Sequence, residues 1–350
     1  MNEMQTILAD SVHRLMGDEI DRKLLEASET GAFPTKLWAA LEANGLTQIL
    51  VPESRGGAGG TWSDARLVLS AAGYHTAPGP IAETLVAGFL LASAGITPPE
   101  GPLTLIEGEL QLHDGKLGGT ARHVPWARAA SHGVALMSDA GKSVILLVPL
   151  KDAGIEPDVN IAREPRDTVT LEHVIVTSGT TSLPANALKL YGALARACQM
   201  AGALDRLTKQ SVAYANERSQ FGKPIGKFQA IQQQLAVLAT QAAAAGMATN
   251  HACACADRNL SDAGAVFEIA IAKLRVDDAS GIATPIAHQV HGAIGFTYEH
   301  ALHFSTRRLW AWRAEYGAGR DWAQWLGHQV MSRGADNLWS DVTARSSDNA

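Results

Sequence analysis

The stretch Asn216–Leu238, NERSQFGKPIGKFQAIQQQLAVL, predicts a sharp turn between two helices, the second of which begins near Lys227. Proline lacks a backbone N–H and has a fixed φ, so the first helix cannot continue through Pro224. Beyond the turn, apolar residues recur at helical spacing and predict a buried stripe made by Phe228, Ile231, Leu235 and Leu238. The turn holds three residues at an exposed, rigid corner: Arg218, Gln220 and Phe221.

The composition is that of a globular protein, with 350 residues, of which 46% are hydrophobic and 18% charged. This length is enough for two or three hydrophobic cores. The formal net charge of −6 gives no electrostatic reason to expect a nucleic-acid partner. No apolar run reaches the roughly 18 residues that a membrane helix needs, and the acidic, amphipathic N-terminus is unlike a signal peptide. We therefore expect no membrane partner and a cytoplasmic location.

The chain contains three cysteines, Cys198, Cys253 and Cys255. An odd number argues against a disulfide framework, and a Cys-x-Cys pair within an alanine-rich helix is not a zinc-binding spacing. We predict that all three are buried and act as small hydrophobic residues.

Periodicity and composition predict three regions followed by a tail. Residues 1–98 have helical patterning, and residues 99–183 contain short β-rich runs separated by Gly, Pro, Asp and Asn, typical of a small antiparallel β domain. Residues 184–339 contain long Ala- and Leu-rich segments, typical of a four-helix bundle. Residues 340–350 are polar and are expected to be frayed. The predicted fold class is α+β, with an N-terminal helical domain, a middle antiparallel β domain and a C-terminal four-helix bundle.

The same patterns predict the individual strands and helices. The predicted strands include residues 103–106, 110–112, 134–137, 144–148 and 169–176. The predicted bundle helices are residues 187–216, 227–257, 263–290 and about 297–312. Core or interface packing is the expected role of the five tryptophans after residue 300, which are Trp310, Trp312, Trp322, Trp325 and Trp339.

Three stretches closely resemble motifs of the acyl-CoA dehydrogenase superfamily, whose members are flavoproteins. Arg218-Ser-Gln220-Phe221-Gly, with Gln229 after it, is similar to the Arg-x-x-Phe-Gly…Phe-Gln signature. Gln289-Val-His-Gly292-Ala-Ile-Gly295-Phe is similar to Gln-x-x-Gly-Gly-x-Gly, and the stretch 51–59, VPESRGGAG, to Pro-Glu-x-x-Gly-Gly-x-Gly. The three occur in the family order and at family spacing, so the resemblance covers nearly the whole chain. It implies the helical, β and bundle order that the residue patterns also predict.

The resemblance implies FAD-dependent α,β-dehydrogenation of an acyl-CoA thioester, with an electron-transfer flavoprotein as electron acceptor. FAD then lies at a subunit boundary, and the bundle of one chain holds the pyrophosphate and adenosine of its neighbour's FAD. Arg218 matches the pyrophosphate-binding arginine, and a forked, permanently charged donor suits a diphosphate. The other residues at matching cofactor positions are Gln220, Phe221, Gln229, Gln289, Gly292 and Gly295.

The motifs that contact the flavin ring in the family are altered in this chain. The family's Thr-Glu-Pro…Gly-Ser-Asp loop has no counterpart between residues 97 and 108. In the next stretch, Gly119-Thr-Ala-Arg-His-Val-Pro-Trp, proline occupies a position where the family carries a hydroxyl. A donor to the flavin is thereby missing.

The catalytic base is also displaced. The common family loop reads Tyr-Glu-Gly-Thr, whereas this chain reads Glu315-Tyr316-Gly317-Ala318, so Tyr316 occupies the base position. Glu315 lies one residue early, which rotates a side chain by about 100° on a helix, and an ordinary helix-end carboxylate is its simpler interpretation. Some relatives carry the base on the preceding helix, but residues 192–193 at that position are Gly-Ala. Glu315 is the remaining candidate.

This pattern resembles the short, partner-dependent subunits of heteromeric acyl-CoA dehydrogenases, some of which act on bulky acyl-CoAs such as steroid side chains. The hypothesis is that the chain pairs with a catalytic homologue and contributes Arg218 and the Gln289 loop to the partner's FAD. Two alternatives are a self-sufficient homo-oligomer that uses Glu315 and a scaffold that binds no flavin. A metal site is a further alternative, because His288, His291, His300 and His303 are closely spaced, but no third ligand with matching spacing is visible.

Overall fold

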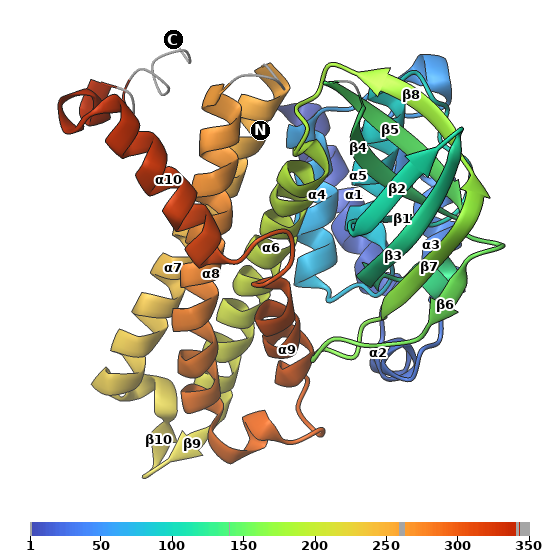
Figure 1. Ribbon diagram of the computed structural model, residues 1–350. Coiled ribbons are helices and arrows are strands. Elements are labelled where there is room, and N and C mark those ends of the chain that lie inside the picture. The colour runs from blue at the N-terminus through green and yellow to red at the C-terminus, as the bar shows by residue number, and fades with distance from the viewer. Residues whose placement is uncertain (1, 140, 259–262, 341–342, 344–350) are drawn as a thin grey trace.

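The computed structural model describes residues 2–139, 141–258, 263–340 and 343, and begins with a helical domain (Figure 1). Two of its helices start with a capping box, in which Asn2 and Gln5 cap one and Thr61 and Asp64 cap the other. Within this domain α5 packs on the β domain and α4 packs on the bundle. The helices are α1 (Glu3–Glu19), α2 (Arg22–Glu29), α3 (Thr35–Ala43), α4 (Trp62–Tyr74) and α5 (Ile81–Ser93).

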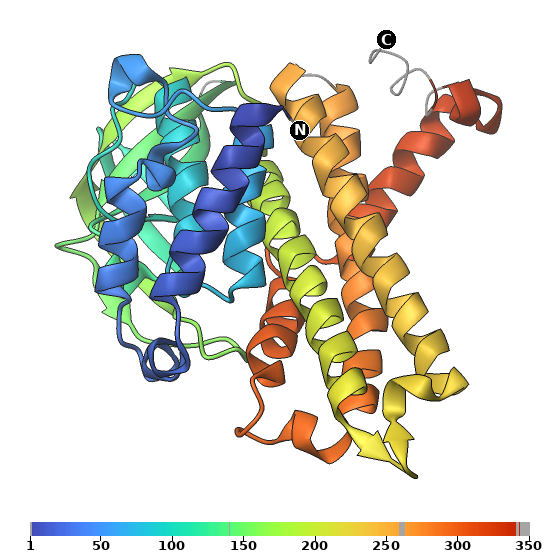
Figure 2. The ribbon, with the colours of Figure 1, turned by 180° about the vertical axis from the view of Figure 1, so that it is seen from behind.

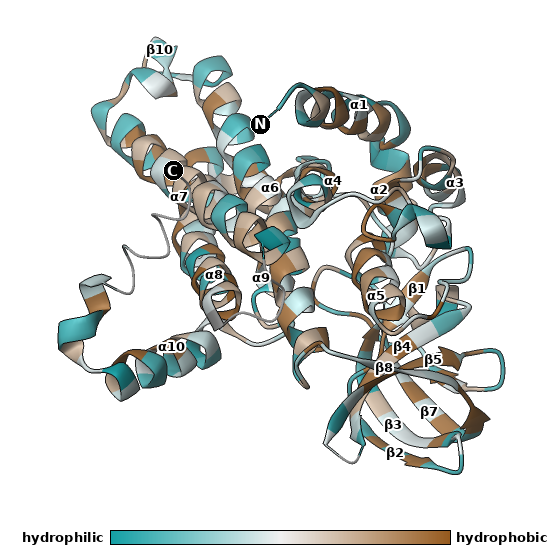
Figure 3. Cartoon of the chain, turned by 90° about the horizontal axis from the view of Figure 1, so that it is seen from above, coloured by the Kyte–Doolittle hydropathy of each residue, from teal (hydrophilic) through white to brown (hydrophobic). Residues whose placement is uncertain are grey.

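The middle region forms two four-stranded sheets, in the orders β1-β4-β5-β8 and β2-β3-β7-β6. Hydrophobic residues are concentrated in these strands and along α5 (Figure 3). The expectation of a purely antiparallel domain is wrong in one place, because β1 pairs with β4 in parallel after the chain has crossed to the other sheet. The strands are β1 (Leu103–Leu105), β2 (Glu109–His113), β3 (Lys116–Pro125), β4 (His132–Asp139), β5 (Lys142–Pro149), β6 (Gly154–Glu156), β7 (Arg166–Ile175) and β8 (Thr177–Thr181).

The last region is a bundle of long helices, of which α6, α7 and α8 lie side by side (Figure 2). The four predicted helices are present, although the last starts at Leu302 and not near residue 297, because residues 297–301 form turns. A further helix, α10, was not predicted and leans away from the bundle (Figure 1). The helices are α6 (Ala187–Glu217), α7 (Gln229–Arg258), α8 (Ala263–His291), α9 (Leu302–Trp312) and α10 (Gly319–Arg333). The fold class is confirmed; most of the predicted polar tail lies outside the described residues.

The turn between α6 and α7 is a tight hairpin. Strands β9 (Ser219–Gln220) and β10 (Lys223–Pro224) pair antiparallel and leave a two-residue loop. Both loop residues have positive φ, 52° at Phe221 and 79° at Gly222, as a type I′ turn requires. The predicted apolar stripe of α7 is only partly buried: Leu238 is fully covered, whereas Phe228, Ile231 and Leu235 are half-buried. These three residues lie at the end of the bundle, where fewer elements pack on α7.

Buried cysteines and tryptophans test two further predictions. All three cysteines are buried, as predicted, and none forms a disulfide. The sulfur atoms of Cys198 in α6 and Cys253 in α7 lie 3.6 Å apart. Trp312 and Trp322 belong to the core, but Trp310 and Trp339 are 46% and 77% exposed. Core packing therefore accounts for part of the tryptophan cluster, and interface packing stays the prediction for the exposed part. No helix within the described residues is both long and apolar enough to cross a membrane.

Candidate functional site

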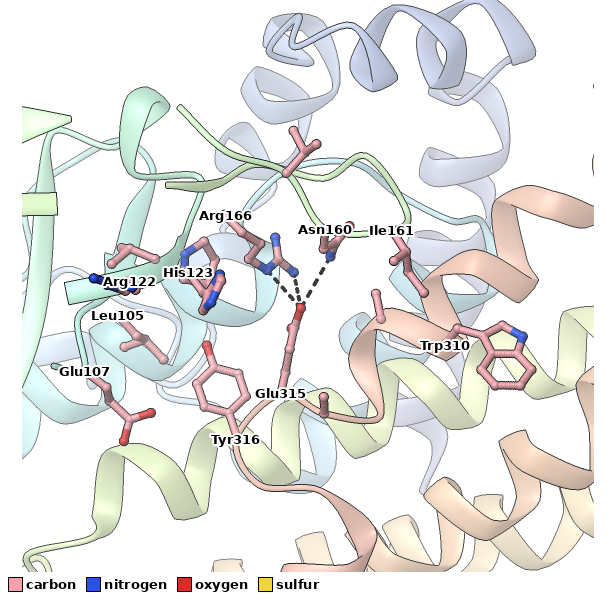
Figure 4. Close-up of a pocket in the computed structure, with 15 residues that line it drawn as sticks. Leu105, Glu107, Arg122, His123, Asn160, Ile161, Arg166, Trp310, Glu315 and Tyr316 are labelled. Atoms are coloured by element: carbon pink, nitrogen blue, oxygen red, sulfur yellow. Dashed lines mark hydrogen bonds and ion pairs between the residues drawn. The ribbon is translucent and has the colours of Figure 1, made fainter. Parts of the chain in front are cut away.

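A cavity of about 560 Å³ lies where the β domain meets the loop between α9 and α10 (Figure 4). Its apolar wall includes Leu105, Val124, Ile161 and Ala311. Its polar lining is formed by Glu107, Arg122, His123, Arg166, Glu315 and Tyr316. This is the cavity in which the sequence motifs would place the chain's own flavin-side residues and its base.

The β-domain wall of the cavity contains an irregularity in β3. The pairing of β3 with β7 shifts register between Ala121 and Val124, which leaves Arg122 and His123 in a bulge. His123 has a φ of +58°, and both side chains line the cavity (Figure 4). Pro125 follows them in the wall and offers no backbone donor. The wall therefore presents the side chains of Arg122 and His123, and has Pro125 where the family motif carries a hydroxyl.

Glu315 is held by cations on both carboxylate oxygens. Arg166 donates from Nε to Oε1 at 2.9 Å, and its Nη2 lies 2.7 Å from the same oxygen. Arg196 Nη2 lies 2.8 Å from Oε2. Guanidinium groups thus occupy both of the oxygens with which a base would accept a substrate proton. The geometry makes Glu315 a structural ion-pair partner.

The contacts of Glu315 extend into a buried cluster of six charges. Arg196 also pairs with Glu83 of α5, and Arg166 lies 3.3 Å from Glu164. Glu164 in turn accepts from Arg308 Nε at 3.1 Å and from Trp312 Nε1 at 2.9 Å. We call Glu83, Glu164, Glu315, Arg166, Arg196 and Arg308 the ion cluster; its three carboxylates and three guanidinium groups sum to zero charge.

The ion cluster keeps the carboxylate of Glu164 ionised. Burial alone would raise the pKa of Glu164, but the nearby guanidinium groups of Arg308, Arg166 and Arg196 lower it to about 2. The cluster draws on α5, the start of β7 and the segment before it, α6, α9 and the loop after α9. It therefore ties all three regions of the chain together directly beneath the cavity.

Tyr316 occupies the family's base position and closes the cavity from the bundle side. Its ring lies against Gly192 of α6, where any Cβ would collide with it. Burial raises the pKa of the Tyr316 hydroxyl well above its ordinary value of 10, so the phenol stays protonated. Lys273 of α8 fixes this loop by donating to the carbonyl oxygens of Arg313 and Gly317, both at 2.9 Å. A neutral phenol cannot remove a proton from a thioester.

One other carboxylate, that of Glu107, lines the cavity. It follows β1 and lies below Leu105, on the same side of the view as Arg122, in Figure 4. Burial raises the pKa of Glu107, while Lys189 acts in the opposite direction. Its side chain meets solvent inside the cavity although protein surrounds it. The sequence motifs gave no indication of this residue, because the family's flavin-side loop has no counterpart between residues 97 and 108.

The matched cofactor residues lie far from this cavity, at the end of the bundle. Arg218, Gln220, Phe221 and Gln229 are all exposed, with the Phe221 side chain 91% accessible. The Arg218 guanidinium forms no ion pair or side-chain hydrogen bond within the described part of the chain. Its backbone N–H donates to Tyr214 O at 2.9 Å, continuing α6 into the hairpin. A free, exposed guanidinium of this kind fits a diphosphate group supplied from outside the chain.

An aromatic stack brings the Gln289 motif to the same end of the bundle. Tyr214, one turn before Arg218, stacks on His291 with ring centroids 4.5 Å apart. Gln289 and Gly292 are exposed beside this stack, and Gly292 has a φ of +63°. Gly295 differs from expectation, because it is buried and a Cβ there would lie 2.9 Å from His291 Cβ. Its lack of a side chain serves internal packing, whereas Gln289 and Gly292 remain open to a ligand.

The four histidines of this region take part in ring contacts. His288 stacks on Phe296 at 4.4 Å, and His291 lies 4.7 Å from His300 between centroids. Among the described residues, no group of three or more His, Cys, Asp or Glu side chains is arranged to hold a metal ion. The close histidine spacing in the sequence therefore reflects packing in this structure.

Acidification should destabilise the stacked histidines. Burial lowers the pKa of His291 from 6.5 to about 4, with His300 and His288 acting in the same direction. Because the unfolded chain binds this proton first, the stability from His291 is complete above pH 6.5 and lost as pH falls towards 4. The pKa of His291 differs by about 2.5 units between 6.5 and about 4. This difference corresponds to a loss on the order of 3 kcal/mol in the free energy of unfolding over this window. Urea unfolding at pH 7, 5.5 and 4.5 measures it.

A matched pair of variants isolates this effect. His291→Phe keeps a stacking ring without a titrating group, so the fall in stability between pH 7 and 4.5 should be smaller than in the parent. His328→Phe changes an exposed histidine of α10 and should leave that fall unchanged. Identical pH profiles for the parent and His291→Phe would show that His291 does not carry the effect.

Comparison with known proteins finds family models and relatives that match this chain in sequence. Residues 187–321 match the family model described as acyl-CoA dehydrogenase, C-terminal domain, and residues 2–95 match the model for the acyl-CoA dehydrogenase N-terminal domain. The chain is 29% identical over 312 residues to the acyl-CoA dehydrogenase IpdE2 of Mycolicibacterium smegmatis, covering 88% of this chain and 93% of that protein. It is 28% identical over 298 residues to IpdE2 of Mycobacterium tuberculosis, covering 81% and 82%.

Solved structures share the same fold. The structure described as the Tcur3481-Tcur3483 steroid ACAD G363A variant superposes with a TM-score of 0.85 at 24% identity, covering 95% of this chain and 99% of that chain. The ChsE4-ChsE5 complex from Mycobacterium tuberculosis superposes with a TM-score of 0.83 at 21% identity, covering 94% and 97%. At these identities, the likeness establishes a common fold.

Proposed function

Since the chain belongs to the acyl-CoA dehydrogenase family of oxidoreductases, we propose that it is the partner-dependent subunit of a heteromeric enzyme. In this proposal, the catalytic partner binds FAD and supplies the base. This chain contributes the pyrophosphate and adenosine contacts through Arg218, Gln220, Phe221, Gln229, Gln289 and Gly292. Gly295 supports that surface from within.

The observation that carries the proposal is the contrast between two sites, the cavity and the end of the bundle that carries Arg218. At the cavity, Glu315 is paired with Arg166 and Arg196, and Tyr316 is protonated. At the bundle end, Arg218 and Gln289 are exposed and unoccupied by partners from the described chain. A self-sufficient enzyme needs an available base at the cavity. A subunit that completes a neighbour's site needs only the exposed residues at the bundle end.

The proposed division of labour follows from the reaction. When bound, FAD supplies hydride acceptance, so the thioester loses hydrogen from its α and β carbons. Removal of the α proton needs a carboxylate within hydrogen-bond distance, which we assign to the partner. Arg218 would hold the diphosphate through charge-assisted hydrogen bonds, and the Tyr214–His291 stack would keep Arg218 and Gln289 on one surface. Precise placement of the cofactor is how this chain would contribute to rate.

The relatives support a heteromeric assembly and a bulky substrate. Two structures with this fold are described as a steroid ACAD named for two components and as a complex of two proteins. By analogy, we infer an acyl-CoA whose acyl group is large, such as a steroid side chain, and an electron-transfer flavoprotein as acceptor. Homologous pairing would place the bundle end of this chain against the FAD domain of its partner.

Visible absorption spectra test the proposal. The purified chain should be colourless, and the complex co-expressed with a homologous catalytic partner should be yellow, with about half a flavin per chain. If the chain alone carries one flavin per subunit and bleaches on addition of an acyl-CoA, it is self-sufficient and the proposal is wrong. A complex that stays colourless but active would support neither, and would exclude a flavin function for Arg218.

Glu315→Gln should leave the dehydrogenase activity of the complex within about twofold. The base lies on the partner in this proposal, so removing a paired carboxylate affects packing and not proton transfer. Because Arg166 and Arg196 would each lose a charged partner, we expect this chain's free energy of unfolding to fall by about 3 kcal/mol. Acyl-CoA turnover and urea unfolding measure the two effects separately.

Glu107→Gln is the matched control, since Glu107 lines the same cavity without joining the ion cluster. It should alter neither activity nor stability strongly. A loss of activity of 100-fold or more in either variant would place a catalytic base in this chain and favour the self-sufficient alternative.

A further inference from the structure

Three large apolar side chains that line the cavity of about 560 Å³ remain exposed. Val159 and Ile161, from the segment between β6 and β7, are 48% and 63% accessible, and Trp310 of α9 is 46% accessible. Ile161 and Trp310 lie at the opposite side of the view from Arg122 in Figure 4. Exposed apolar surface in a concave site is typical of ligand binding. This side of the cavity therefore fits the apolar part of a ligand.

The bulge in β3 brings two consecutive side chains into this cavity. In a regular strand, neighbouring side chains point to opposite faces of the sheet, so only one of Arg122 and His123 would line it. The register shift against β7 and the φ of +58° at His123 interrupt this alternation, and both side chains line the cavity. A residue other than glycine is strained at positive φ, and such strain is concentrated at ligand-binding sites.

The side-chain nitrogens of Arg122 and His123 are available to a ligand. Both side chains are exposed, and neither forms an ion pair or a side-chain hydrogen bond with another residue in the part of the chain that the structure describes. A guanidinium is permanently charged and presents a fork of N–H donors that matches a carboxylate. The imidazole adds a further N–H donor. This end of the cavity therefore fits the head group of an anion.

Other charged groups in the lining affect an anion differently. Arg166 and Glu315 pair with each other inside the ion cluster, so neither is free to bind or repel a ligand strongly. Glu107 also lines the cavity, and burial raises the pKa of its carboxyl group. When it is ionised, Glu107 repels a second carboxylate in the same space. The cavity thus contains one group that attracts an anion and one that opposes it, and the two can be removed separately.

We propose that the cavity binds a bulky apolar carboxylic acid in its free, ionised form. The carboxylate pairs with Arg122 and His123, and the apolar body covers Val159, Ile161 and Trp310. A volume of about 560 Å³ falls within the range of small-molecule sites and suits a body of several fused rings. A flavin ring and a thioester carbonyl, which the family resemblance implies for this cavity, are uncharged and would leave the Arg122 guanidinium unpaired.

The inference rests on the proposed function in one respect, namely that flavin does not occupy this chain's own cavity. Visible absorption reports bound flavin independently of any carboxylate. A purified chain that carries FAD contradicts the proposed function. A flavin-free chain that binds no carboxylate contradicts only the present inference, so the two failures are distinguishable.

Fluorescence titration of the purified chain with 1-pyrenebutyrate tests the site. We expect saturable 1:1 binding, because this chain alone forms the cavity. The uncharged counterpart 1-pyrenebutanol should bind about tenfold more weakly, since it cannot form a charge-assisted pair with Arg122. Equal affinities for the two probes would show that the cavity does not select an anion.

Substitutions of charged residues locate the head group. Arg122→Gln should lower the affinity for 1-pyrenebutyrate about tenfold and remove the difference between the two probes. Because Arg122 is exposed and unpaired within the described chain, folding should be unaffected. Lys116→Gln removes an exposed cation at the other end of β3 and should change neither affinity. Glu107→Gln should strengthen binding of 1-pyrenebutyrate by about two- to threefold and leave that of 1-pyrenebutanol unchanged.

A pair of tryptophan variants locates the apolar body. Trp310→Ala should weaken binding of both probes about tenfold, because it removes part of the apolar wall. Trp339→Ala removes a more exposed tryptophan outside the cavity and should have no effect. Equal weakening by the two variants, or unchanged 1-pyrenebutyrate affinity in Arg122→Gln, would place the ligand elsewhere and overturn the proposal. So would the absence of saturable binding at submillimolar probe concentration.

Discussion

Arg218→Ala should lower the affinity of the assembled complex for FAD about 100-fold. Arg218 is exposed and unpaired within the described chain, so its removal leaves no buried charge and should not affect folding. Two charge-assisted hydrogen bonds to a diphosphate, each worth roughly 1.5 kcal/mol at an accessible site, give about 3 kcal/mol, and hence the 100-fold estimate. Titration of the flavin-depleted complex with FAD, followed by quenching of flavin fluorescence, measures the dissociation constant.

Two further variants define the reason for the loss. Arg218→Lys keeps the charge but loses the forked geometry, so its affinity should be intermediate. Arg320→Ala removes another exposed arginine, on α10, and should leave the dissociation constant unchanged. If the complex with Arg218→Ala retained FAD at parental affinity, this chain would not contribute the pyrophosphate contact, and the scaffold alternative would gain support.

Arg196→Met should destabilise the chain by about 3–5 kcal/mol. Its guanidinium pairs with Glu83 and Glu315, and its side chain is only 3% exposed. Removing one partner from a buried network leaves the remaining charges without compensation in a region of low dielectric. The midpoint of urea unfolding should therefore fall strongly in the variant.

The matched control is Lys209→Met, which breaks an ion pair with Asp205 whose side chains are 61% and 51% exposed. Such surface pairs contribute less than about 1 kcal/mol. The double variant Glu83→Gln with Arg196→Met should recover part of the loss, since one uncompensated carboxylate is removed. A loss below 1 kcal/mol for Arg196→Met would mean that water reaches the ion cluster and screens it.

The sequence predicted the helical and β regions because their signals are local. The long bundle helices show 3.6-residue periodicity, and the turn at Pro224 has strong stop signals. The strand β3 was missed because its Gly, Arg and His residues lack β-rich composition and include a bulge. The parallel pairing of β1 with β4 depends on a crossover between sheets, which no local pattern reports. The helix α10 has few buried residues and so carries a weak apolar pattern.

The two candidate sites differed in how far the sequence could describe them. Arg218, Gln220 and Phe221 lie within one turn, so a motif reports them together. The ion cluster joins residues as distant as Glu83 and Glu315, and no spacing rule links them. Arg196 is the single charged residue between Leu190 and Leu204 of α6, and this apolar setting was the only hint that the sequence offered. The sequence could show that Glu315 was misplaced, but not that two arginines hold it.

In the hairpin between α6 and α7, two opposed requirements act on the residue at position 221. A type I′ turn favours asparagine before glycine, because a bulky side chain at positive φ is strained by roughly 1–2 kcal/mol. Phe221 nevertheless occupies this position, with its ring 91% exposed and a φ of +52°. Selection for folding alone would therefore replace Phe221 with asparagine, whereas selection for an assembled, cofactor-loaded enzyme would retain the aromatic ring. Libraries screened under the two regimes should diverge at this residue.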